Sequence, residues 1–195
     1  MHGLSKALLV TTTLMLPAVG MAQQTATQPF SYSYVELAYD ESDFDLGLGG
    51  DIDGDGLTLS GSYEINEDWH AYASYGNADL DFGIDVDTLA IGAGYRYPLQ
   101  DDLDIYGRVL YISSDVDVPG PGNADEDGLA LQVRLRYRVT DEFEVEGGIQ
   151  HVDVFDSDTS LQASARYHFN RNFSAGIALT FAGSDAFGIN ARYSF

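Results

Sequence analysis

Residues 51–56, which read Asp-Ile-Asp-Gly-Asp-Gly, match the first half of a calcium-binding loop, in which alternate carboxylates supply oxygen ligands. The second half does not match, because the twelfth position is Ser62 where such loops carry a bidentate Glu. The flanking sequence also favours strands rather than helices. Two interpretations stay open: weak Ca²⁺ binding by Asp51, Asp53 and Asp55, or a solvated loop stabilised by Asp-Gly turns. We expect no other cofactor.

Catalysis by acid–base or nucleophilic chemistry needs a histidine held next to a carboxylate or a hydroxyl group. His151 and Asp153 form the pair that comes nearest to this requirement. His151, however, occupies an odd position on a face that is otherwise apolar, which favours an interfacial histidine. His70 and His168 have small polar neighbours that suit structural roles. We therefore predict that the protein is not an enzyme.

The arginines follow a rule of parity. The chain has nine Lys and Arg residues, and all except Lys6 are arginines. Seven arginines hold even positions inside segments whose large apolar residues hold odd ones, and only Arg171 departs from the rule. Successive side chains of a β-strand point to opposite faces, so one face is apolar and the other is charged. An apolar face that continues around the whole protein needs an apolar solvent, which predicts lipid.

Composition restricts the function further. The 195 residues have a formal net charge of −22, which argues against nucleic acid as a partner. The absence of cysteine excludes a disulfide framework, while 13 tyrosines and 10 phenylalanines argue against disorder. An apolar run follows Lys6 and ends in Gly-Met-Ala, so residues 1–22 are predicted to be a secretory signal peptide. The alternative, a retained anchor, would need a longer run to span a bilayer.

Ten segments share one phase, with apolar or small residues at odd positions and Ser, Thr, Gly, Gln, Arg or Glu at most even ones. Their apolar sets lie in residues 35–39, 57–65, 69–75, 89–97, 103–111, 129–139, 143–149, 161–169, 173–181 and 187–195. A soluble sandwich also alternates, but its inward face normally carries large side chains. Here the polar face is rich in Gly and Ser, and aromatics gather at the ends of the apolar sets, as in the girdles of outer-membrane barrels.

We therefore predict an all-β fold, a transmembrane antiparallel up-and-down β-barrel of ten strands over residues 31–195, preceded by a short periplasmic segment, 23–30. Eight strands is the fallback if two segments were divided wrongly. Short connections are predicted at 66–68, 98–102, 140–142 and 170–172, and they alternate with longer ones at 40–56, 76–86, 114–128, 153–158 and 183–185. Short turns are expected in the periplasm, together with both termini, and the longer loops, which hold most of the acids, outside.

The signal peptide, the strand meander and the ending Tyr193-Ser194-Phe195 resemble those of the small bacterial outer-membrane β-barrel proteins, the OmpA-barrel and OmpX-like group. The resemblance covers residues 23–195 and implies a location in the bacterial outer membrane. It also implies that Tyr193 and Phe195 belong to the signal read by the barrel-insertion machinery. The chain departs from OmpX because it reads as ten strands rather than eight.

If the residues on the two sides of each short turn pair symmetrically, opposite charges face each other on the inner face of the sheet. Arg96 is predicted to face Asp104, Arg138 to face Glu144, and Arg136 to face Glu146, while Glu64 faces His70. An arginine fork suits this place because it holds a carboxylate bidentately and stays charged. The predicted lumen network contains Arg96, Asp104, Arg108, Arg134, Arg136, Arg138, Glu144, Glu146, Arg166 and Arg192.

Two functions fit these patterns. In the first, the charged pairs fill the lumen and the barrel, a monomer, has a structural or surface-interaction role. Its acidic loops would contact lipopolysaccharide through shared divalent cations, and its apolar face would contact membrane lipid. In the second, the charges form the constriction of a narrow porin-like channel for ions or small solutes. The sequence leaves both open.

Overall fold

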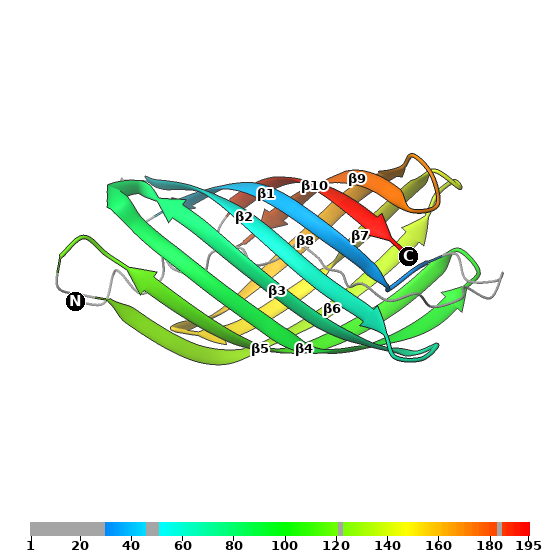
Figure 1. Cartoon of the computed structure of the whole chain (residues 1–195), viewed down its shortest axis with the longest axis horizontal. Helices are drawn as coiled ribbons and strands as arrows, with labels where there is room; N and C mark the ends of the chain where they lie inside the picture. Colours follow the sequence, from blue (N-terminus) through cyan, green and yellow to red (C-terminus); the bar gives the residue numbers. More distant parts are fainter. Residues whose placement is uncertain (1–29, 46–50, 121–122, 183–184) are drawn as a thin grey trace.

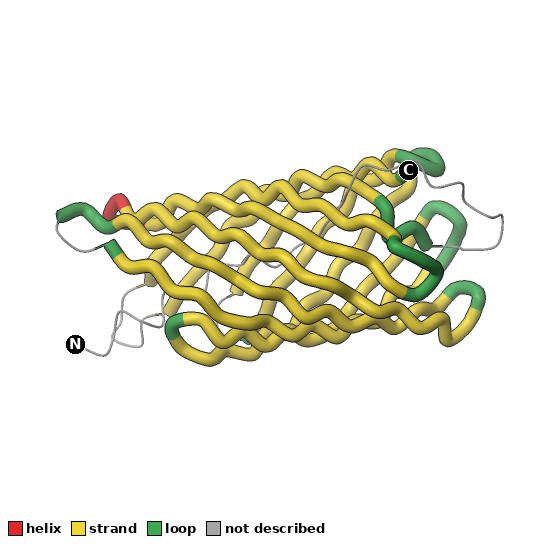
Figure 2. The backbone as a smooth tube through the Cα atoms, turned by 60° about the horizontal axis from the view of Figure 1, so that its bottom comes forward, coloured by secondary structure: helices red, strands yellow, loops and turns green. Residues whose placement is uncertain are grey.

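The computed structural model describes residues 30–45, 51–120, 123–182 and 185–195. The predicted signal peptide, residues 1–22, lies outside the described residues. Nearly all of the described chain is extended, apart from one turn of 3₁₀ helix (Figure 2). The elements are β1 (Tyr34–Asp45), β2 (Asp51–Glu64), β3 (Trp69–Leu80), η1 (Asp81–Gly83), β4 (Ile84–Gln100), β5 (Leu103–Asp117), β6 (Ala124–Arg138), β7 (Phe143–Val154), β8 (Asp156–His168), β9 (Phe173–Phe181) and β10 (Asp185–Ser194).

These strands form a closed barrel. Each strand pairs antiparallel with its neighbours in the chain, and β1 pairs with β10 to complete the ring (Figure 1). The strands run obliquely around the long axis, as closure of a sheet requires. This arrangement confirms the predicted ten-stranded, up-and-down barrel. No helix within the described ranges is long and apolar enough to span a membrane.

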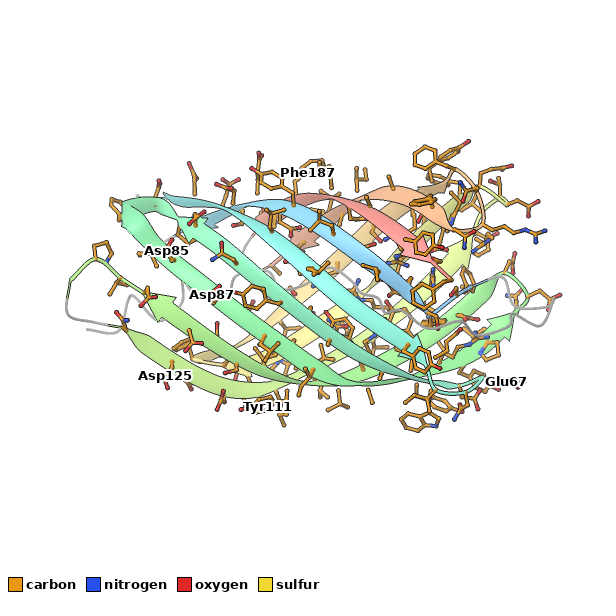
Figure 3. The ribbon with its side chains drawn as sticks, viewed as in Figure 1. Glu67, Asp85, Asp87, Tyr111, Asp125 and Phe187 are labelled. Atoms are coloured by element: carbon orange, nitrogen blue, oxygen red, sulfur yellow. The ribbon has the colours of Figure 1, made fainter. Side chains whose placement is uncertain are left out.

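The two faces of the sheet separate by parity as predicted. Arg134 and Arg136 are 2% and 3% exposed, whereas Leu135 between them is 47% exposed. The buried side chains of the described strands thus point into the lumen, and the large exposed apolar side chains form the outer surface. An exposed apolar surface of this extent is stable only against an apolar solvent. Figure 3 shows Tyr111 and Phe187 pointing away from the barrel.

The two ends of the barrel differ in chemistry. One end, here the turn end, carries the short connections after β2, β4, β6 and β8 and lies beside the C-terminus. The other, the acidic end, carries most of the exposed acids, and Figure 3 places Asp85, Asp87 and Asp125 there and Glu67 at the turn end. Outward-facing aromatics mark both borders of the apolar surface, with Trp69 against Tyr95 at the turn end.

The strands extend further at the acidic end than predicted. Residues 40–56, 76–86 and 114–128, expected to be loops, largely belong to β1–β6. The reason is that the alternation continues: Val86 and Val116 are buried, while Asp85, Asp87 and the neighbouring acids point outward. Asp disfavours strands intrinsically, but pairing and burial of its neighbours override that preference. At the other end, β1 begins at Tyr34 rather than at Ser31.

Candidate functional site

The lumen near the turn end contains a network of buried charged side chains. Its arginines project from β4, β6, β8 and β10, and its acids from β1, β5 and β7. The ion pairs, with their closest N–O distances, are Arg96–Asp104 at 3.4 Å, Arg134–Glu146 at 2.8 Å, Arg136–Glu144 at 2.7 Å, Arg138–Glu144 at 3.4 Å, Arg166–Glu36 at 2.7 Å and Arg192–Glu36 at 2.9 Å. Each of these cations has a partner within the lumen.

The register of β6 and β7 is as predicted, but the ion pairs are not simply the residues that face each other. Arg136 lies opposite Glu146, yet its Nε and Nη2 both donate to Glu144, at 2.7 and 3.2 Å. Glu146 instead accepts from Arg134 Nη1 at 2.8 Å. A long arginine reaches diagonal neighbours, and a bidentate contact favours the carboxylate that its fork can match. Backbone register therefore does not decide the partner.

The predicted register of β4 and β5 is wrong by two residues. Arg96 lies opposite Tyr106, not Asp104, because β4 continues to Gln100 and the turn lies at residues 101–102 rather than at 98–102. The pairing also shifts between Pro98 and Gln100. Proline lacks an N–H donor, so a ladder commonly becomes irregular beside it. The Arg96–Asp104 ion pair still forms diagonally.

Glu36 is the acid of the network that sequence reasoning missed. Its side chain is fully buried, and it accepts hydrogen bonds from the guanidinium of Arg192 and contacts that of Arg166. It holds an even position in a segment whose odd positions include Leu37 and Tyr39. The parity rule would have found it, since the same rule found the arginines.

Arg108, also predicted in the network, is held mainly by neutral groups. Its Nε donates to His70 Nε2 at 3.0 Å and its Nη1 to Gln132 at 3.5 Å. The guanidinium carbon lies 4.5 Å from the ring centre of Tyr106, within the range of cation–π attraction. Glu64 lies opposite His70 as predicted.

A glycine makes room for the His70–Arg108 contact. A Cβ at Gly94 would overlap the His70 ring and lie 2.8 Å from Arg108 Cγ. We expect Gly94→Ala to lower the free energy of unfolding by about 1–3 kcal/mol, because overpacking displaces both side chains. Gly107→Ala is the matched control, since its Cβ meets only Gln132 O, at 3.5 Å. Urea titration of both variants in lipid vesicles would measure the difference, and equal stabilities would contradict this assignment.

Residues 30–33 lie inside the lumen at the turn end. Phe30 and Tyr32 are each 1% exposed and pack with Tyr106. The Tyr32 hydroxyl donates to Asp104 at 3.3 Å, and Arg136 Nη1 donates to the carbonyl of Ser31 at 3.1 Å. The guanidinium of Arg136 also lies 4.8 Å from the ring centre of Phe30. These four residues are therefore fixed by the charged network itself.

This segment reaches across the barrel. It precedes β1, and Arg136 belongs to β6, which is five strands from β1 in either direction around the ring. On the near side, Glu64 Oε1 accepts from the Tyr32 backbone N–H at 3.1 Å and Ser62 donates to the Tyr32 carbonyl at 2.9 Å. Phe30 was predicted to belong to a periplasmic segment, but the structure places it in the lumen. The inward aromatics at even positions continue before β1, which explains this correction.

The candidate calcium ligands do not lie in a loop. Asp51, Asp53 and Asp55 hold alternate positions of β2, where residues two apart are separated by about 6.6–7 Å. Asp53 faces Asp43 and Asp55 faces Glu41 across the sheet. Among the described residues, no three His, Asp or Glu side chains form a group that could hold a metal ion.

His151 and Asp153 do not contact each other in the manner of a catalytic pair. His151 Nδ1 lies 2.8 Å from Thr159 Oγ1, and Asp153 accepts from the Ser157 hydroxyl at 2.8 Å. Both side chains are exposed on the outside of the barrel. At the C-terminus, the ring of Tyr193 packs against Phe173, and the Phe195 backbone N–H donates to the Ser33 carbonyl.

Comparison with known proteins agrees with this architecture. The model of the outer membrane protein beta-barrel domain matches residues 11–181. Among solved structures, the KdgM porin aligns with a TM-score of 0.51 and 10% identity, over 83% of this chain and 99% of that one. Neisserial surface protein A aligns with a TM-score of 0.45 and 16% identity, over 83% and 96%.

Pseudomonas aeruginosa OprF aligns through its N-terminal β-barrel domain, with a TM-score of 0.42 and 14% identity, over 83% of this chain and 97% of that one. No curated protein matches the chain. At 10% identity the KdgM porin indicates the fold alone, whereas the family model covers most of the sequence. The chain belongs to the outer membrane protein β-barrel domain family, whose members are barrels of the bacterial outer membrane.

Proposed function

We propose that this protein is a non-enzymatic, non-conducting outer-membrane barrel with a structural or surface-interaction role. The observation that carries the proposal is the closure of the turn end by residues 30–33. Two aromatic rings and the Arg136 guanidinium there occupy the part of the lumen through which a solute would have to pass. The ion pairs of Glu36, Glu144 and Glu146 fill the layer behind them.

The proposed orientation puts the turn end and both termini in the periplasm and the acidic end outside. Short periplasmic turns and longer outer connections are the usual asymmetry of such barrels. The exposed acids at the acidic end would then meet the anionic groups of lipopolysaccharide, with shared divalent cations between them. Tyr193 and Phe195 would be read by the insertion machinery before the strands close.

A narrow channel is the second candidate, and one observation favours it. Ser60, Ser74 and Ser174 each have a buried hydroxyl with no hydrogen-bond partner in the part of the chain that the structure describes, and all three face the lumen. Buried polar groups are normally paired with protein or ordered water, so water is expected beside them. Water in the lumen is a requirement for conduction, although it does not open the turn end.

Single-channel recording separates the two functions. We expect folded protein in a planar bilayer to show no stable openings, because residues 30–33 and Arg136 close the turn end. Altered gel mobility on boiling would verify that the sample is folded. Stable openings whose conductance changes in Arg136→Ala or Arg138→Ala would establish the channel instead.

A further inference from the structure

The acidic end of the barrel holds a pocket that the closure of the turn end leaves accessible. Its volume is about 650 Å³, and it is lined by residues of β1, β2, β3, η1, β9 and β10. Among the described residues that line it, every charged one is an acid, including Glu41, Asp43 and Asp55. Acids alone do not make a site, so the interior of the pocket has to be considered.

Three buried oxygen atoms in and below this pocket have no hydrogen-bond partner among the described residues. Thr180 lines the pocket, is 3% exposed and has an unpaired Oγ1. Asp40 lies one step deeper on the inner face of β1, is 6% exposed and has an unpaired Oδ1. Asn190 of β10, 5% exposed, has an unpaired Oδ1. Buried polar atoms are normally paired with protein or ordered water, so this set can accept hydrogen bonds from a ligand that displaces water.

The lumen makes specific room for the Asp40 carboxylate. Asp40 lies opposite Gly188 of β10, and a Cβ at that glycine would overlap Asp40 Oδ1. The next acid on the same face, Glu36, already holds Arg166 and Arg192. A buried carboxylate without a cation is costly unless it takes up a proton, so a cation from outside the described protein groups would stabilise the charged form of Asp40.

The positions of the acids in this pocket indicate which kind of cation it would bind. The acids are spread from the rim down to Asp40, and the described residues include no group that could hold a metal ion at one point. The apolar side chains of Leu80 and Ala186 lie between rim and base. Such a site fits a flexible chain with several ammonium groups separated by methylenes, because each charge can meet its own acid.

We propose that this pocket binds a linear aliphatic polyamine, with one ammonium group at Asp40 and the others at the rim acids. One ammonium donates to Asp40 and a second, nearer the rim, donates to Thr180, while the methylenes between the ammonium groups lie against Leu80 and Ala186. The proposal deepens the surface-interaction role by naming the chemical class of one ligand. It does not require that the turn end be sealed.

Calorimetric titration of the folded protein in detergent micelles with spermidine tests this site. We expect saturable binding, and a loss of about tenfold in affinity in Asp40→Asn, the scale of one hydrogen bond to a charged group. Gly188→Ala should weaken binding to a similar extent, because the new methyl displaces the carboxylate. Thr180→Val removes only the unpaired hydroxyl and should weaken binding less.

The matched control is Asp125→Asn on β6, which removes the same charge from an exposed residue at the same end but outside the pocket. Its affinity should stay within about twofold of the parent, as for a screened surface charge. Equal effects of Asp40→Asn and Asp125→Asn would overturn the proposal, as would Ca²⁺ binding more tightly than spermidine. If the Asp40→Asn variant does not fold, the spermidine affinities of the Gly188→Ala and Thr180→Val variants test the proposal instead. A protein that conducts and still binds spermidine would refute only the proposed function.

Discussion

Glu36→Gln is expected to lower the free energy of unfolding by about 3–5 kcal/mol, the cost of removing one partner from a buried ion pair. Glu36 Oε2 lies 2.7 Å from Arg166 Nη2 and 2.9 Å from Arg192 Nε, and all three side chains are almost fully buried. Glutamine keeps the size of the side chain but not the charge. Two buried guanidinium groups would then lose the carboxylate that lies between them.

Urea titration of the folded barrel in lipid vesicles would measure this loss. Glu41→Gln on the same strand is the control: Glu41 is exposed on the outer surface, so its replacement should change stability by no more than about 0.5 kcal/mol. If the two variants were equally stable, the lumen around Glu36 would be hydrated well enough to screen the arginines. The network would then contribute little to holding the barrel together.

The sequence predicted the barrel, its strand number and the inward direction of the seven arginines at even positions, because these depend on the alternation of inward and outward side chains along a strand. That alternation is repeated in every strand, so local ambiguity at Tyr32 and Tyr34 did not alter the result. The same reasoning could not give the ion pairs. Whether Arg136 bonds Glu144 or Glu146 depends on side-chain reach and on bidentate fit, which a register of backbone positions does not contain.

Two further features of the structure were not predicted from the alternation of inward and outward side chains. The position of residues 30–33 inside the lumen depends on where the chain leaves the sheet. Inward aromatic residues at even positions before β1 fit both a strand and a segment that folds into the lumen. The length of β4 and β5 at the acidic end was underestimated because Asp is rare in strands. Here outward Asp alternates with inward Ile84, Val86 and Val116, so burial of the apolar side chains extends the pairing.

The lumen is consequently divided along its axis. Charged pairs and the rings of Phe30 and Tyr32 fill the half near the turn end, whereas apolar and small polar side chains line much of the other half. Asp40 is an exception, since it is a buried acid that takes part in none of the ion pairs between described residues of the arginine network. With the proposed closure of the turn end, an accessible acidic pocket would make the barrel a surface receptor for a cation rather than a pore.

Val133→Arg is expected to destabilise the barrel by about 2–4 kcal/mol, the cost of an arginine that faces lipid at the midplane of a transmembrane barrel. Val133 is 47% exposed on the outside of β6, between Gly107 of β5 and Ile149 of β7. Along the chain it lies midway between Asp127 of β6 and Val139, which directly follows β6, and so near the centre of the apolar band. Reversible unfolding from phospholipid vesicles would give the difference in free energy.

Val139→Arg provides the matched control, because the same substitution is made at a residue that is also 47% exposed. Val139 lies beyond the outward Tyr137, at the turn end, where lipid headgroups and water are in reach, so the expected cost is about 0–1 kcal/mol. A soluble barrel would tolerate both arginines equally, since both valines would face water. The difference between the two sites therefore measures depth in the bilayer, and its absence would contradict the membrane-spanning placement of β6.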